Sequence, residues 1–374
     1  MIWLKKPIAL VFQRHLVFYD SPTNLSYAWN FGFIAFCLLA LQIISGVFLA
    51  MHYTPHTDLA FNSVENIRRN LNTGWFLRYL HANGASFYFI ALYVHIFRGL
   101  YFGSYLKPKH IVWILGVIIL FLSIITAFLG YILPWGQMSL WGATVITSLA
   151  SAIPIIGTQL TFWLWGGFSV DLATLNRFFS LHYLLPFVIT ALTFLHLAFL
   201  HKDGSNNPMG ISSKLDKVHR YPYFILKDIV GLLIFLLCYF SIVFYTPNLL
   251  GHSDNFICAN ALITPAHIVP EWYFLPFYAI LRSIPHKLIG VVARRLSIII
   301  LALLPWLHSN LIRSSRFFSL FKFIYWTLIF CCFILGWIGS QPVEYPYILL
   351  GQCASIYYFM FFLRILPLMK QING

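Results

Sequence analysis

The chain has 374 residues, of which 60% are hydrophobic and only 9% are charged, and its formal net charge is +14. These proportions lie far outside those of soluble globular proteins and exclude an ordinary water-soluble domain. Several apolar stretches reach the roughly 20 residues that a helix needs to cross a bilayer. The sequence therefore predicts an all-α, polytopic membrane protein.

Eight apolar stretches are long enough to be predicted as transmembrane helices. We expect the fifth to begin before its apolar core, nearer Ile225. The first twenty residues are typical of a short amphipathic helix that lies on the membrane surface. The eight predicted spans are Ala28–Met51, Trp75–Phe102, Ile111–Leu133, Leu172–Leu200, Ile229–Tyr245, Leu288–Leu307, Phe318–Ile338 and Tyr347–Met369.

The positive charge gathers on one side of these predicted spans. Eight spans place both termini on that side, and the stretch from Ile111 to Asn176 contains no Lys or Arg. Basic loops face the cytoplasm or the matrix in membrane proteins. The basic residues are not interleaved with aromatic residues as in a nucleic-acid surface, so no nucleic-acid partner is expected.

Two of the predicted spans each carry two histidines 14 positions apart, namely His81 with His95 and His182 with His196. Fourteen residues are just under four helical turns, so both imidazoles of a span share roughly one face, about 21 Å apart. Two such helices set face to face would stack two histidine pairs across the membrane, which is a ligand set for haem. A hydrogen-bonded core histidine is the ordinary alternative for any one of them, but the repeated spacing favours haem.

Glycines recur at the same interval of 14 in the first and third spans. Small residues level with each histidine pair would let a flat macrocycle approach the backbone, although helix packing is an alternative for any one glycine. We therefore expect residues 1–210 to form a di-haem four-helix bundle, followed by a C-terminal transmembrane domain over residues 211–374. These glycines are Gly32, Gly46, Gly116 and Gly130.

Two arginines lie three residues from a histidine, Arg78 before His81 and Arg98 after His95. An arginine fork binds a carboxylate well, so both are candidates to bind haem propionates. The alternative is that the side chains extend to the lipid headgroups. That alternative is weaker for Arg78 than for Arg98.

Two polar clusters lie near opposite membrane faces. Glu271 follows Pro270 in an apolar loop, where burial should raise its pKa and make it a proton acceptor near neutral pH. The second cluster, on the positive side, could hydrogen-bond and protonate a quinone. A solvated turn is the alternative in both places. The second cluster consists of His201, Ser205, Lys227 and Asp228.

The four-histidine pattern occurs together with the segments PWGQMSLWGATVIT, GSNNPMG, PEWYF and GSQPVEYPYI. In this combination the sequence resembles the mitochondrial cytochrome b family, the haem subunit of the cytochrome bc complex, or respiratory complex III. The resemblance covers essentially the whole chain. Arg294 and Arg295 depart from it, because the family usually has apolar residues at these positions, a turn and a half into the sixth span.

The resemblance implies the catalytic subunit of ubiquinol–cytochrome c reductase. Such a protein oxidises ubiquinol at an outer site, passes electrons through two non-covalent b-type haems and reduces ubiquinone at an inner site, coupled to proton translocation. The resemblance also implies a multi-pass protein of the mitochondrial inner membrane with both termini on the matrix side. The implied partners are the Rieske iron–sulfur protein, cytochrome c1, other complex III subunits and a second copy of the complex.

The resemblance also assigns roles to residues. His81 and His182 would hold the low-potential haem, and His95 and His196 the high-potential haem. His201, Ser205, Lys227 and Asp228 would form the inner quinone site, with His201 and Asp228 taking part in its chemistry. The outer site would use Glu271 and Tyr273, with walls from Phe128, Tyr131, Met138, Gly142, Val145, Ile268, Pro270 and Phe274.

Two other functions compete with this interpretation. A transporter or proton channel could use buried histidines as a relay, but it should carry acidic partners within its spans. A haem protein that only carries electrons would leave Glu271 and the cluster around Asp228 without a role.

Overall fold

The structure is a computed structural model that describes residues 17–308 and 313–372. The described part is mostly helical, and its two strands, β1 (Asp20–Pro22) and β2 (Lys217–His219), form a small antiparallel sheet. Most of the amphipathic helix expected at the start of the chain falls outside these residues.

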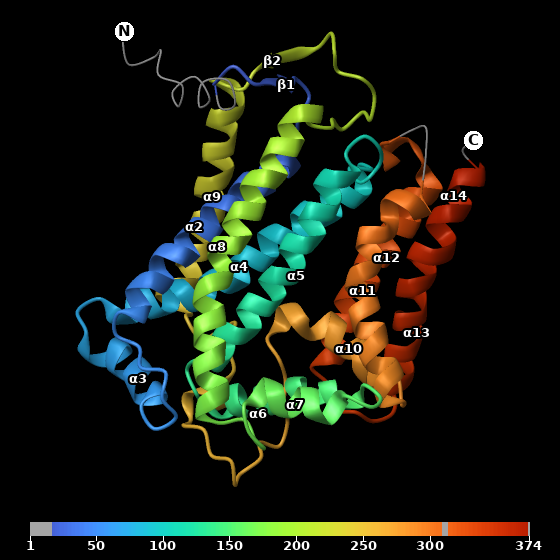
Figure 1. Cartoon of the computed structure of the whole chain (residues 1–374). Helices are drawn as coiled ribbons and strands as arrows, with labels where there is room; N and C mark the ends of the chain where they lie inside the picture. Colours follow the sequence, from blue (N-terminus) through green and yellow to red (C-terminus); the bar gives the residue numbers. More distant parts are fainter. Residues whose placement is uncertain (1–16, 309–312, 373–374) are drawn as a thin grey trace.

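Five long helices pack together in the first two thirds of the chain (Figure 1). Helix α4 packs against α2 and α9, while α5 packs against α8. Short α3 (Ala60–Asn70) lies beside α4, and its Glu65 accepts from Arg68 and Arg69 at 2.5 and 2.7 Å. The five helices are α2 (Phe31–Ala50), α4 (Gly74–Tyr101), α5 (His110–Ile132), α8 (Leu172–Asp203) and α9 (Tyr223–Tyr245).

The C-terminal part is a second group of packed helices. Helix α10 contacts α11, α12 and α13, and α13 continues through a π-helical turn, η8 (Phe361–Ile365), into α14. Two short helices, α6 (Gln137–Ser148) and α7 (Gly157–Trp165), lie across the ends of the long ones in Figure 1. The C-terminal helices are α10 (Leu275–Ser283), α11 (Lys287–Leu307), α12 (Ser319–Gly339), α13 (Tyr347–Met360) and α14 (Leu366–Ile372).

Seven helical segments of the described chain are long and apolar enough to cross a membrane, and each overlaps one of the eight predicted spans. Helix α4 is not among them, although its 28 residues would extend about 42 Å. The reason is composition, because α4 carries two arginines, two histidines and a buried Asn83. The fifth span begins at Tyr223, before its apolar core, as expected.

Helix α8 has a clear start and stop. The Asp171 side chain accepts from the Thr174 backbone N–H, and the Asp171 N–H donates to Thr174 Oγ1 at 3.2 Å, which forms a capping box. The Asp171 side chain also accepts from the Leu172 N–H at 2.8 Å. The helix ends at Asp203 and is followed by Gly204, whose φ of +75° suits a glycine C-cap. Because α8 continues to Asp203, His201 lies in its last turn and not in a loop after Leu200 as the predicted boundary implied.

Candidate functional site

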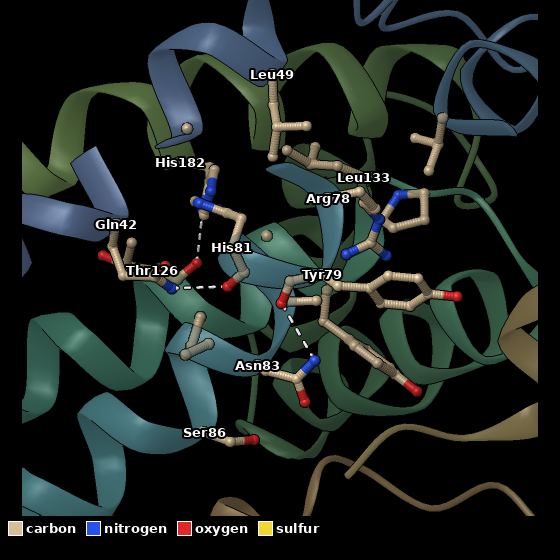
Figure 2. A pocket seen from close by; sticks show the side chains of 18 of the residues that line it. Gln42, Leu49, Arg78, Tyr79, His81, Asn83, Ser86, Thr126, Leu133 and His182 are labelled. Atoms are coloured by element: carbon tan, nitrogen blue, oxygen red, sulfur yellow. Dashed lines mark hydrogen bonds between the residues drawn. The ribbon is translucent and has the colours of Figure 1, made fainter. Parts of the chain in front are cut away.

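His81 of α4 and His182 of α8 face each other between the helices (Figure 2). Their ring centroids are 6.2 Å apart and the ring planes are at 84°. Two metal–nitrogen bonds of about 2 Å plus two ring radii of about 1 Å add up to about 6 Å. The pair therefore has the spacing of two imidazoles on opposite sides of one metal ion.

The ring nitrogens of this pair are already oriented. His182 Nδ1 lies 2.8 Å from the Thr126 carbonyl, which can only accept a hydrogen bond. The Ser45 hydroxyl donates to the Leu41 carbonyl at 2.7 Å, so its oxygen accepts from His81 Nδ1 at 2.9 Å. Both Nδ1 atoms therefore carry the proton, which leaves the Nε2 lone pairs for a metal. Such partners hold metal-ligating histidines in place.

His95 and His196 form a second pair with similar spacing, 6.4 Å between ring centroids and 57° between planes. Arg98 lies beside this pair, with its Nη2 at 3.2 Å from His95 Nδ1 and its guanidinium 5.0 Å from the centre of the Trp29 ring. The Arg98 Nε is buried without a hydrogen-bond partner among the described residues. An acceptor such as a carboxylate would satisfy it.

Each of the four glycines faces a different one of the four histidines. An added Cβ would lie 3.0 Å from His95 Cε1 at Gly32 and 3.0 Å from His81 Cε1 at Gly46. The corresponding distance is 3.3 Å to His196 at Gly116 and only 2.4 Å to His182 at Gly130. The missing side chains therefore make room for the imidazoles themselves, which lie against the backbone of the neighbouring helix.

A cavity of about 280 Å³ adjoins the first histidine pair. It extends to Arg78, which Figure 2 shows on the α4 turn before His81. Three residues of the predicted quinol site also line the cavity, namely Tyr131, Glu271 and Tyr273. The histidine pair and the predicted proton acceptor thus share one space.

The loop with Glu271 packs against the face of α4 that does not carry the histidines. Trp272 Nε1 donates to Ser86 Oγ at 3.0 Å, and Tyr93 Oη donates to the Tyr273 carbonyl at 2.5 Å. The Tyr273 ring stacks on Phe89 with centroids 4.3 Å apart. Ser86, Phe89 and Tyr93 follow helical spacing. One helix therefore carries two histidines on one face and positions the acidic loop with another.

Glu271 lies in surroundings that favour a protonated carboxyl group. Burial raises its pKa to about 7, against the opposing effects of the Arg78 charge and the Tyr131 hydroxyl. A carboxyl group with this pKa can accept and release a proton near neutral pH.

The other predicted wall residues do not line this cavity. Phe274 instead packs edge-on against Tyr273 at 4.5 Å, and Phe128 packs against Phe178 at 6.2 Å. Gly142 borders open space, because an added Cβ would meet nothing within 4 Å. The residues outside the cavity are Phe128, Met138, Gly142, Val145, Ile268, Pro270 and Phe274.

The predicted cluster at the other end is divided between two groups. Asp228 forms an ion pair with Arg220, whereas Lys227 Nζ donates to the Leu25 carbonyl at 2.5 Å. His201 lies against Tyr19, with ring centroids 4.3 Å apart.

Tyr19 connects His201 to the Arg220–Asp228 ion pair, because it contacts His201 and interacts with Arg220. Burial raises its pKa, while its interactions with Ser205 and Arg220 oppose that rise. Tyr19 and Arg220, like Ser45 and Thr126 at the first pair, were not found from the sequence, because no spacing or motif links them to their partners.

Comparisons with known proteins agree on one family, cytochrome b. The family described as Cytochrome b/b6/petB matches residues 16–204, and Cytochrome b(C-terminal)/b6/petD matches residues 258–359. The chain is 63% identical over 373 residues to cytochrome b of Chondrus crispus, covering 100% of this chain and 98% of the relative. It is 58% identical over 370 residues to cytochrome b of Solanum tuberosum, covering 99% and 94%.

A solved structure also matches over the whole length. A chain of a hyperthermophilic respiratory complex III superposes with a TM-score of 0.94 at 34% sequence identity. The match covers 100% of this chain and 98% of that chain.

Proposed function

The chain belongs to the cytochrome b family, and on this premise we propose that it is the quinol-oxidising subunit of ubiquinol–cytochrome c reductase. The proposed reaction oxidises ubiquinol at the end of the molecule near Glu271 and reduces ubiquinone at the end near Asp228. Protons are released at the first end and taken up at the second, which builds a potential across the membrane.

We propose that four histidines hold two non-covalent b-type haems, His81 with His182 and His95 with His196. The ring spacings, the proton positions at Nδ1 of the first pair and the unpartnered Arg98 Nε support this assignment. Haem at each pair supplies one-electron oxidation and reduction when bound. Arg78 and Arg98 would bind the propionates.

The membrane arrangement follows from the same assignment. Helix α4 would also cross the membrane and bring the number of spans to eight, because its polar residues would face haem and protein and not lipid. Helices α2, α4, α5 and α8 would then form a four-helix bundle within residues 1–210, followed by the C-terminal domain of residues 211–374. Gly32, Gly46, Gly116 and Gly130 let the histidines approach the opposing helices closely enough to leave room for a macrocycle.

At the first end, Glu271 accepts a proton from the quinol hydroxyl. Its raised pKa, its place in the cavity and the supporting contacts of Trp272 and Tyr273 with α4 favour this role. Tyr273 and Tyr131 would bound the quinol ring. The open space at Gly142 is consistent with a hollow that extends toward α6, where Met138 and Val145 would form walls with Phe128, Ile268, Pro270 and Phe274.

At the second end, His201 and Asp228 would hydrogen-bond and protonate the quinone. The Arg220–Asp228 ion pair, the Tyr19–His201 contact and the interaction of Tyr19 with Arg220 support these roles. Ser205 and Lys227 would complete the binding site.

The proposed setting is the mitochondrial inner membrane, with both termini on the matrix side. The proposed partners are the Rieske iron–sulfur protein, cytochrome c1, other complex III subunits and a second copy of the complex.

The observation that carries this proposal is the cavity that joins the His81–His182 pair to Glu271. The test is a reduced-minus-oxidised optical spectrum of the purified complex, titrated against potential. We expect two b-type components, of which His182→Leu removes one and His196→Leu the other. An exposed histidine replaced in the same way, His52→Leu, is the control. A folded, membrane-inserted protein without any haem signal would contradict the proposal and favour a histidine relay.

A further inference from the structure

Each histidine pair lies near an arginine whose Nε is buried without a hydrogen-bond partner in the described part of the chain. At the second pair this arginine is Arg98, which the proposed function already assigns to a propionate. Near the first pair it is Arg68 of α3, and not Arg78, the arginine that the sequence indicated. A buried donor without an acceptor costs free energy, so we expect its partner to come from outside the described chain.

Three contacts fix the direction of the Arg68 side chain. Its Nη2 donates to Glu65 Oε2 at 2.5 Å, and its Nη1 donates to the Tyr79 hydroxyl at 3.5 Å. Its Cζ lies 5.3 Å from the centre of the Phe256 ring, a distance typical of a cation–π contact. Because Tyr79 belongs to α4, the guanidinium extends from α3 to the turn of α4 that precedes His81.

Helix α3 is held against α4 directly beside Arg68. Ile67 is buried, and its carbonyl oxygen lies so close to Gly74, the first residue of α4, that an added Cβ there would overlap it. Arg68 is therefore presented by a close contact between two helices and not by a loop, which suits a residue that binds a cofactor.

The charges around Arg68 leave room for an anion. Arg68 and Arg78 both line the cavity beside the first histidine pair, and their positive charges repel each other. The acidic residues that line this cavity are Glu65 and Glu271. Glu65 is shared between Arg68 and Arg69, and Glu271, with a pKa of about 7, carries only part of a negative charge near neutral pH. This side of the cavity therefore attracts a further negative charge.

We propose that Arg68 is an additional haem-binding residue of the first pair, which binds one propionate through its unpartnered Nε while Arg78 binds the other. The inference rests on the proposed function, because it requires a haem between His81 and His182. A haem carries two propionates, and a guanidinium fork is well suited to a carboxylate. Arg68 comes from α3, outside the four helices of the bundle, so α3 would help to bind the first haem but not the second.

The test compares the two b-type components of the purified complex, of which the one that His182→Leu removes belongs to the first pair. Redox-titrated optical spectra give the midpoint potentials. Resonance Raman spectra, recorded with only the second component reduced and then with both reduced, give the propionate bending band of each haem. A hydrogen bond to a propionate changes this band, whereas a distant charge changes the potential alone.

We expect Arg68→Gln to affect the first component in both measurements. Its redox equilibrium should shift about ten-fold toward the oxidised haem, which is about 59 mV for a one-electron couple, because a positive charge that stabilises the added electron is lost. The propionate band of the first haem should shift because its hydrogen bond is lost. Neither value should change for the second component.

Two further variants control this experiment. Arg69→Gln is the matched control, because Arg69 belongs to the same helix and donates to the same Glu65, but is exposed and does not line the cavity. It should keep the propionate band and the potential of the wild type. Arg68→Lys keeps the charge but loses the planar fork, so its potential should stay near that of the wild type while the propionate band shifts.

Three results would overturn the assignment of Arg68. Arg68→Gln could leave the propionate band of the first haem unchanged, which would show that Arg68 acts from a distance or binds a free anion. Arg69→Gln could shift the first component as much as Arg68→Gln does, which would indicate a general effect of α3. If Arg68→Gln does not assemble, a lysine variant with the wild-type propionate band has the same meaning. A wild-type complex without any haem signal would instead contradict the proposed function itself.

Discussion

The two histidine pairs have nearly the same spacing but different surroundings. At the first pair, the imidazoles are 6.2 Å apart beside a cavity of about 280 Å³ that also contains Glu271. At the second pair the ring centroids are 6.4 Å apart, and the carboxylate predicted for that end, Asp228, is held in an ion pair with Arg220. The spacing of the imidazoles therefore does not distinguish the two ends. The difference lies in whether a carboxyl group is available to exchange a proton.

The largest effect is expected from removing Glu271, the proposed proton acceptor at the first end. Glu271→Gln keeps the shape of the side chain but cannot accept a proton, so we expect quinol oxidation to fall about 10²- to 10⁴-fold. Because the pKa of Glu271 is about 7, the wild-type rate should rise as the pH increases through 7 and the carboxylate becomes deprotonated. The glutamine variant should lose that rise. Steady-state reduction of cytochrome c with ubiquinol, from pH 5.5 to 9, measures both.

The control for this prediction is Glu344→Gln, which changes an exposed carboxylate in the same way. It should keep both the rate and the pH dependence. A Glu271→Gln variant with a wild-type pH profile would show that another group accepts the proton.

The second largest effect is expected at the glycines that pack against the histidine pairs, and it should differ between the two pairs. Gly130→Ala places a Cβ 2.4 Å from His182 Cε1, whereas Gly116→Ala places it 3.3 Å from His196. Overpacking of this kind costs about 1–3 kcal/mol, which corresponds to a roughly 5- to 160-fold loss of haem affinity. We expect Gly130→Ala to reduce or shift the optical component of the first pair, and Gly116→Ala to change the second component much less. Equal effects of the two variants would mean that the haem, and not the imidazole, sets the clearance.

The sequence predicted the long helices and the facing histidines because both depend on local composition and on the helical period. The match at His81 and His182 is of this kind, and so is the early start of α9 at Tyr223. Groups that act across elements could not be predicted. Ser45 meets His81 from another helix, and Arg220 reaches Asp228 from the chain before α9. Helix α4 was predicted as a span but is not among the seven candidate spans of the described chain, because it carries two arginines and two histidines.

The smallest effect is expected at the second end. Asp228→Asn removes a carboxylate but leaves Arg220 to bind the quinone oxygen, so we expect quinone reduction to fall about ten-fold or less, below the roughly 10²- to 10⁴-fold of general acid–base catalysis. Oxidation of the pre-reduced complex by a short-chain ubiquinone analogue, with the first end inhibited, measures this step. Asp216→Asn is the matched control, because Asp216 is exposed. Within the described residues, its carboxylate accepts a side-chain hydrogen bond from Thr23 alone. A loss at Asp228 as large as that at Glu271 would mean that the ion pair opens during turnover and that the two carboxyl groups do equivalent work.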